Sequence, residues 1–194
     1  MSPRNSLWFV LLAGFLATAW VGAATVTVRG YGLGDPSRYQ GSLQSTEAAK
    51  RAALLDLKRQ LLYLGGTEVQ KTSDGYAIIN KGRIGDAEPE YRSLSPVFAE
   101  AASDYEIPEA LSQRVMQQIQ VNVAYTGALD VNAFGSAKAY LNWVDDSLVK
   151  ALGDELSKKG WFKGGASVTL EFLHFERSLG KKKIAAKIWY VAKK

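Results

Sequence analysis

The sequence predicts an α+β protein in which a mostly antiparallel sheet is covered by two long amphipathic helices, with a C-terminal β-hairpin. Two segments, 45–64 and 136–159, repeat apolar residues at the spacing of a helix face. Shorter segments alternate apolar and polar side chains, which is the pattern of half-buried strands. This order predicts a single domain over 25–194, and it also permits two sub-units, 25–128 and 129–194.

The first 24 residues have the composition of a secretory signal peptide. Arg4 precedes an apolar run from Leu7 to Ala24 that ends in small residues, as a signal peptidase requires. Cleavage after Ala23 or Ala24 leaves roughly 170 residues, which is enough for one domain with its own core. We therefore expect a periplasmic protein. The alternative is an inner-membrane anchor through residues 7–24, because that run is close to the ~20 residues that span a bilayer.

A strand is expected over 24–29, where Val26 and Val28 alternate with threonine. The glycine-rich segment 30–36 then predicts a turn, because glycine tolerates positive φ and an Asp-Pro pair disfavours a helix. A dinucleotide-binding loop is not indicated. Such a loop needs its third glycine one place later and a helix that follows at once.

The first helix is expected over 45–64, with Ser45 as a capping hydroxyl, and Gly65-Gly66 would end it. A hairpin is expected next, with strands at 67–71 and 76–80 joined by an Asp-Gly turn. One stripe of the helix is apolar and should be buried. Its members are Ala49, Ala53, Leu57, Leu61 and Leu64.

Residues 25–75 resemble the N-terminal module of the LPP20 and flagellar assembly protein T group of bacterial envelope proteins. The resemblance lies in a strand of the form V-x-V-x-G-x-G, an alanine-rich helix and a following Gly-x-x-Val; its residues beyond the strand are Ala49, Ala53, Asp56, Leu57, Gly66 and Val69. It implies a periplasmic α+β module that associates with a surface or flagellar assembly. The chain lacks the lipobox cysteine of the lipoprotein members, since it contains no cysteine.

The segment 82–110 is rich in proline and acidic residues and is expected to be an exposed loop. Its carboxylates, Asp86, Glu88 and Glu90, could bind a hard cation or act as an acid and base pair. Both uses require rigid elements that bring the carboxylates together. We therefore expect these side chains to be solvated.

A strand is expected over 115–125, followed by a calcium-loop-like segment, 130–135, in which non-ligating residues occupy ligand positions. The second helix is expected over 136–159. Its adjacent acids, Asp145 and Asp146, point about 100° apart and are expected to be solvated. The buried stripe should comprise Leu141, Val144, Leu148, Leu152 and Leu156, with Tyr140 and Trp143 beside it.

The chain ends in an expected hairpin of 166–177 and 182–192. Strict alternation would place Phe172 and His174 on the same face as Val168 and Leu170, and Leu173 on the other. His174 is the only histidine. A lone histidine within a strand is typical of a packed or hydrogen-bonded side chain rather than a catalytic one.

The formal net charge is +5, and it is unevenly distributed. From Lys150 onward the chain holds 11 Lys or Arg against 4 Asp or Glu. A basic end can contact an anionic membrane surface or an acidic protein face. Nucleic acid is not expected as a partner, because the chain carries an export signal and Arg177 is the only arginine of this basic end.

The sequence carries no nucleophile, phosphate-binding or metalloprotease motif. Zinc sites prefer cysteine and histidine, and the chain has no cysteine and one histidine. We therefore predict no catalytic residues, no cofactor and no metal site, and hence a protein that is not an enzyme. Hydrolysis by dispersed carboxylates remains an alternative, because such acids come from distant positions.

These patterns together predict a periplasmic accessory or structural protein of a bacterial cell-envelope assembly of the flagellar, pilus or secretion type. Its expected partner is an envelope protein complex. The alternative is an exported module that binds lipid or another anionic ligand through the basic C-terminal hairpin. The candidate partner-contact residues are Tyr140, Trp143, Trp189, Lys181, Lys182 and Lys183.

Overall fold

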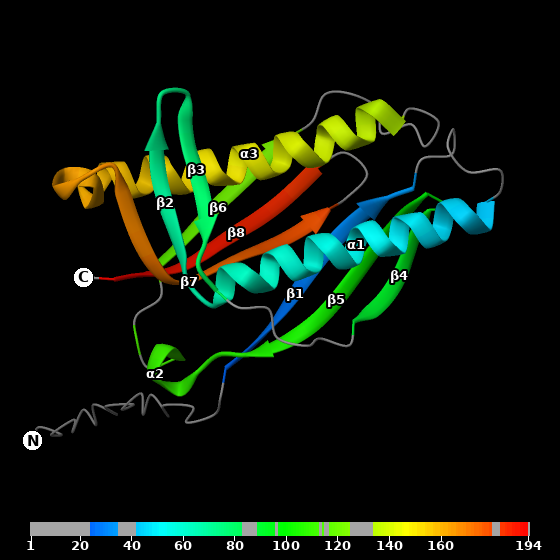
Figure 1. Ribbon diagram of the computed structural model, residues 1–194, viewed down its shortest axis with the longest axis horizontal. Coiled ribbons are helices and arrows are strands. Elements are labelled where there is room, and N and C mark those ends of the chain that lie inside the picture. Colours follow the sequence, from blue (N-terminus) through cyan, green and yellow to red (C-terminus); the bar gives the residue numbers. More distant parts are fainter. Residues whose placement is uncertain are drawn as a thin grey trace, which may run out of the picture.

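The computed structural model describes residues 24–34, 42–82, 89–95, 97–112, 114, 117–124, 134–179 and 183–193. Within them, helices combine with antiparallel sheets, which confirms the α+β class (Figure 1). The elements in chain order are β1 (Thr25–Leu33), α1 (Ser42–Leu64), β2 (Thr67–Thr72), β3 (Gly75–Asn80), β4 (Glu90–Ser95), β5 (Phe98–Glu106), α2 (Glu109–Ser112), β6 (Gln117–Ala124), α3 (Phe134–Lys158), a 3₁₀ turn (Trp161–Gly164), β7 (Ser167–Leu179) and β8 (Lys183–Ala192).

The signal segment expected over 1–24 lies outside the described residues except for Ala24. Among the helices that are described, none combines the length and the apolar character that crossing a bilayer requires.

The described strands form two antiparallel sheets, whereas the sequence predicts one. The smaller sheet has the order β1-β5-β4, and the larger has the order β3-β2-β7-β8-β6. Strand β2 of the first half of the chain pairs with β7 of the second half. The possible sub-units 25–128 and 129–194 therefore share one sheet.

Each long helix covers its own layer of the molecule. Helix α3 packs on one face of the five-stranded sheet, and α1 lies across β1 and β5 (Figure 1). We call the two clusters of buried side chains the α3 core and the α1 core. The α1 core also includes Phe172 and Val191, from the other face of β7 and β8. The larger sheet is thus apolar on both sides, which joins the two layers.

The glycine-rich turn expected at 30–36 is wrong for residues 30–33, because β1 continues to Leu33. These glycines bring the strand backbone against α1. Two strand residues advance about 6.6–6.8 Å, and four helix residues advance about 6 Å. Every second residue of β1 can therefore lie against every fourth residue of α1. A Cβ atom at each glycine would overlap the helix backbone: Gly30 at Ala53 and Leu57, Gly32 at Ala49 and Ala53, and Gly34 at Ser45.

The exposed loop expected over 82–110 is also wrong, since β4 and β5 lie within it. Ala99 and Ala101 of β5 are buried in the α1 core and pair in register with Gly32 and Gly30. Small side chains on both strands make a flat surface on which α1 can lie closely. Alanine is a poor strand former, so the sequence pattern concealed this strand. Asp86 and Glu88 lie outside the described residues.

Strand β7 departs from the strict alternation that the sequence predicts. Its register with β8 shifts between Leu170 and Phe172, and such a bulge reverses the faces of the residues that follow. Leu173 and Phe175 therefore join Val168 and Leu170 in the α3 core. Phe172 lies in the α1 core instead.

Candidate functional site

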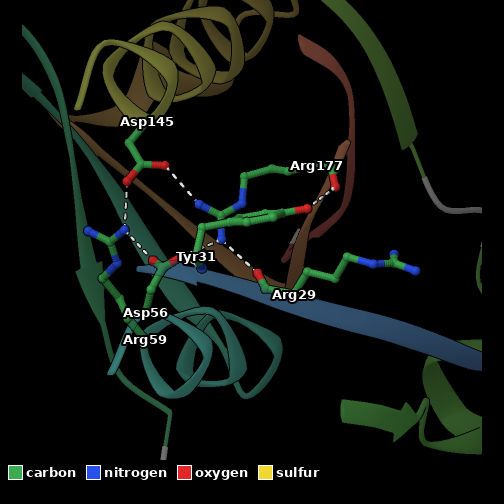
Figure 2. A network of polar contacts seen from close by, with 6 residues as sticks. All are labelled: Arg29, Tyr31, Asp56, Arg59, Asp145 and Arg177. Atoms are coloured by element: carbon green, nitrogen blue, oxygen red, sulfur yellow. Dashed lines mark hydrogen bonds and ion pairs between the residues drawn. The ribbon is translucent and has the colours of Figure 1, made fainter. Parts of the chain in front are cut away.

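Four charged side chains from three elements form a closed ring of ion pairs at the junction of the two layers (Figure 2). Arg177 of β7 places its Nη2 2.7 Å from Asp56 Oδ2 and its Nη1 3.1 Å from Asp145 Oδ1. Arg59 Nη2 lies 2.5 Å from Asp56 Oδ1 and 2.6 Å from Asp145 Oδ2. We call these four residues the charge ring. Two positive and two negative groups alternate in it, so its net charge is zero.

The charge ring also forms hydrogen bonds with main-chain groups of β1, which is an edge strand. The Tyr31 backbone N–H donates to Asp56 Oδ2 at 2.8 Å, and Arg177 Nη2 donates to the Arg29 carbonyl at 2.7 Å. The Tyr31 hydroxyl donates to the Arg177 carbonyl at 3.2 Å, and the guanidinium lies 5.3 Å from the centre of its aromatic ring. The ring therefore connects α1, α3, β1 and β7.

Mutual pairing keeps the ring ionised. Burial acts to raise the pKa of Asp56, but Arg177, Arg59 and the Tyr31 backbone N–H outweigh it, so this pKa lies below its ordinary value. Burial acts to lower the pKa of Arg177, and Asp56 and Asp145 raise it by more. The pKa of Arg59 is raised by the same two carboxylates. The Asp56 carboxyl therefore carries no proton near neutral pH, and its role in the ring is to bind the two arginines.

Asp145 corrects the expectation that both adjacent acids of α3 are solvated. Its side chain is 26% exposed and pairs with two arginines, whereas Asp146 is exposed. The two acids diverge on the helix, and only Asp145 faces α1 and β7. The positions of the two acids along the helix predict that they point apart. They do not predict which residues lie opposite Asp145.

A pocket of about 310 Å³ opens beside the charge ring, between α1 and α3. Leu55, Leu141 and Asn142 line it together with Tyr31 and the four ring residues. Leu55 is 70% exposed. The pocket is thus lined by two leucines, an aromatic ring, an amide and four charges that already pair with one another.

A second pocket, of about 240 Å³, contains His174. The side chain is 3% exposed. Burial lowers its pKa to about 4; Glu176 opposes this, while Arg177 and Arg29 add to it. The imidazole is therefore neutral near pH 7, in keeping with the packed histidine that the sequence predicts.

His174 should make the protein less stable in mild acid. The unfolded chain has an ordinary histidine pKa of 6.5 and the folded chain one of about 4, so the unfolded state binds more protons between these values. Stability should therefore fall as the pH is lowered through this window, by up to about 3 kcal/mol. Urea unfolding at a series of pH values measures this. His174→Gln should flatten the slope, and an unchanged slope in that variant would contradict the assignment.

The structure describes one of the six candidate partner-contact side chains. Trp189 is partly buried, lines the second pocket, and donates from Nε1 to Glu176 Oε2 at 3.0 Å. Tyr140 and Trp143 belong to α3 and Lys183 to β8, but their side chains lie outside the described part. Lys181 and Lys182 lie outside it entirely.

Sequence reasoning did not identify the charge ring, although two signals were present. Arg177 follows Leu173 and Phe175 at the spacing of one strand face, and a charge in an apolar phase indicates a buried, paired group. Asp56 likewise adjoins the buried stripe of α1 between Ala53 and Leu57. The structure brings these two residues together across 121 positions of sequence.

Within the described ranges, no three His, Asp or Glu side chains lie close enough together to hold a metal ion. No protein-family model, curated protein or solved structure matches this chain.

Proposed function

We propose that this protein is a non-enzymatic accessory or structural component of a bacterial cell-envelope assembly and that it acts in the periplasm by binding other proteins. Two features of the sequence support the location. Residues 1–24 have the composition of an export signal. Residues 25–75 resemble the LPP20 and flagellar assembly protein T group.

The charge ring is the observation that carries this proposal. It joins four ionisable side chains, and each of its charges binds other members of the ring. General acid–base catalysis needs a group whose pKa lies near the working pH. The pKa of Asp56 is held low and that of Arg177 high. This arrangement favours a structural role for the cluster, as a clamp between α1, α3 and β7.

The surface of the fold offers features that suit a protein partner. Two long helices over antiparallel sheets, with a C-terminal hairpin, leave strand edges at β1, β3, β4 and β6. Several large apolar side chains are exposed, and such side chains contribute strongly to protein interfaces. They are Leu43 (75% exposed), Leu55 (70%), Tyr91 (44%) and Ile79 (41%).

The alternative is a module that binds lipid or another anionic ligand through the basic C-terminal hairpin. Several described cations of that end already have partners inside the protein. Arg177 is buried in the charge ring. Lys187 Nζ lies 3.6 Å from Glu176 Oε1, and Lys159 Nζ lies 3.3 Å from Glu155 Oε1. Paired cations attract an external anion less strongly, so a protein partner is favoured.

The proposal can be tested by expressing the full chain with a C-terminal tag in a Gram-negative bacterium that encodes it. We expect the protein in the periplasmic fraction, and envelope-complex proteins should co-purify with it after mild cross-linking. A variant without residues 1–24 is the control. It should stay in the cytosol and capture none of them.

Three results would contradict this function. The first is full-length protein dissolved in the cytosol. The second is salt-sensitive pelleting with anionic vesicles in the absence of any envelope partner, which would favour the anionic-ligand module. The third is a hydrolytic activity abolished by a single carboxylate substitution, which would favour the dispersed-carboxylate enzyme.

A further inference from the structure

The second pocket lies at the free edge of β1 rather than against one face of the strand. Val26 lines the pocket and packs on the α1 core, whereas Thr25 and Thr27 line it from the alternate positions of the strand. Successive strand residues point to opposite faces, so a pocket lined from both faces lies at the edge. We call it the edge pocket. Its far wall consists of His174, Glu176 and Trp189.

Alternate residues of β1 direct their main-chain groups away from β5. The Ala24 carbonyl accepts a hydrogen bond from the Ile107 N–H, so the main-chain N–H and C=O groups of the even-numbered residues of β1 point toward β5. The main-chain groups of the odd-numbered residues point toward the free edge. Arg29 and Tyr31 show this directly, because their main-chain groups bond to Arg177 and Asp56 of the charge ring.

Thr25 and Thr27 continue the same row beyond the charge ring. Across the described ranges, no hydrogen bond reaches the main chain of Thr27 on this edge. An unpaired strand edge is a template on which another extended chain can form hydrogen bonds. Among the described residues, the ring therefore hydrogen-bonds one part of the β1 edge, and the main chain of Thr27 beside the pocket has no such partner there.

The walls of the edge pocket suit an amphipathic peptide. The hydrogen bond from Trp189 Nε1 to Glu176 Oε2 holds the indole in place. The buried, neutral His174 also lines the pocket, and so does Arg29, whose side chain is 39% exposed. A pocket lined by an aromatic surface, a carboxylate and a guanidinium can accept an apolar side chain whose neighbours are polar.

We propose that the edge pocket binds an extended segment of a partner protein, which adds as a strand to β1. The backbone of that segment pairs with Thr25 and Thr27, and one of its apolar side chains packs on Trp189. This inference rests on the proposed function, which requires a protein partner, and it identifies where that partner binds. It also gives a role to Trp189, which the sequence marks as a contact residue.

The probe for this site is a set of linear peptides selected from a random phage-displayed library against the purified protein. Thr27→Pro removes the edge N–H and leaves the pairing with β5 intact, so it should weaken binding at least about tenfold. Thr27→Val is the matched control. It also loses the bond from Thr27 Oγ1 to Asp104 but keeps the N–H, so binding should stay within about twofold.

A measurement on the unmodified protein makes the test independent of how Thr27→Pro folds. Bound peptide should slow hydrogen exchange at the Thr27 amide, from which no described residue accepts a hydrogen bond on this edge. Peptides that bind Thr27→Pro equally well, or that protect only other amides, would overturn the edge site. So would a library that yields no binder, or an edge occupied by a second copy of this chain in a dimer that Thr27→Pro disrupts.

The two proposals can fail separately. If envelope proteins co-purify equally well with Thr27→Pro and with the unmodified protein, the edge site is wrong and the proposed function stands. If no envelope protein co-purifies with the unmodified chain, the proposed function itself is contradicted.

Discussion

Replacing Gly32 by alanine is expected to destabilise the protein by about 3 kcal/mol, the upper end of the usual cost of overpacking. The added Cβ would overlap backbone atoms of Ala49 and Ala53. Helix backbone cannot rotate aside as a flexible side chain can, so α1 must move away from β1. That movement opens the α1 core. The free energy of unfolding in urea, with circular dichroism as the signal, measures the loss.

Gly164→Ala is the matched control for this substitution. No atom lies within 4 Å of a Cβ built on Gly164, and its backbone φ is not positive. The free energy of unfolding should therefore change by less than about 0.5 kcal/mol. Equal effects of the two variants would show that α1 does not approach β1 as closely as the structure indicates.

Replacing Arg177 by methionine is expected to cost about 3–5 kcal/mol, the usual effect of removing one partner from a buried ion pair. Methionine fills much of the same space, so the loss reports mainly on charge. Asp56 and Asp145 would share Arg59 alone, and the Arg29 carbonyl would lose its donor. Denaturant unfolding near neutral pH measures this change.

Arg92→Met is the control, because Arg92 is 68% exposed and lies 3.4 Å from Glu100. An exposed pair of this kind contributes at most about 1 kcal/mol. Adding Asp56→Asn to Arg177→Met should recover part of the lost stability, since it removes one of the two carboxylates that would share Arg59. Equal losses of unfolding free energy in Arg177→Met and Arg92→Met would contradict a buried charge ring that stabilises the fold.

Gly32→Ala and Arg177→Met test the two features that the sequence patterns did not predict correctly. These features are the close approach of β1 to α1 and the charge ring. Glycines at 30, 32 and 34 are the usual signal of a turn, and here they allow a strand to approach a helix. The difference depends on Ala49 and Ala53, which lie in another element. Local sequence records which residues are small, but it does not record what comes close to them.

The charge ring shows the same limit for polar groups. A solvated acid and a buried, paired acid look alike in sequence, and Asp145 was expected to be the former. Its partners, Arg59 and Arg177, lie 86 and 32 positions away. Nothing in the periodicity of α3 indicates that an arginine from β7 ends opposite this carboxylate.

The sequence by itself determined the properties that depend on near neighbours along the chain. Periodicity indicated the mixed helix and strand class and the buried stripe Ala49 to Leu64, because burial of one face imposes a repeat on the residues. The presence of a single histidine within a strand indicated that His174 is packed. Only the tertiary structure decided the division into two sheets, the path of β1 against α1, and the charge ring. Each of these arises where segments far apart in sequence meet, and the free energy of such a contact depends on both surfaces together.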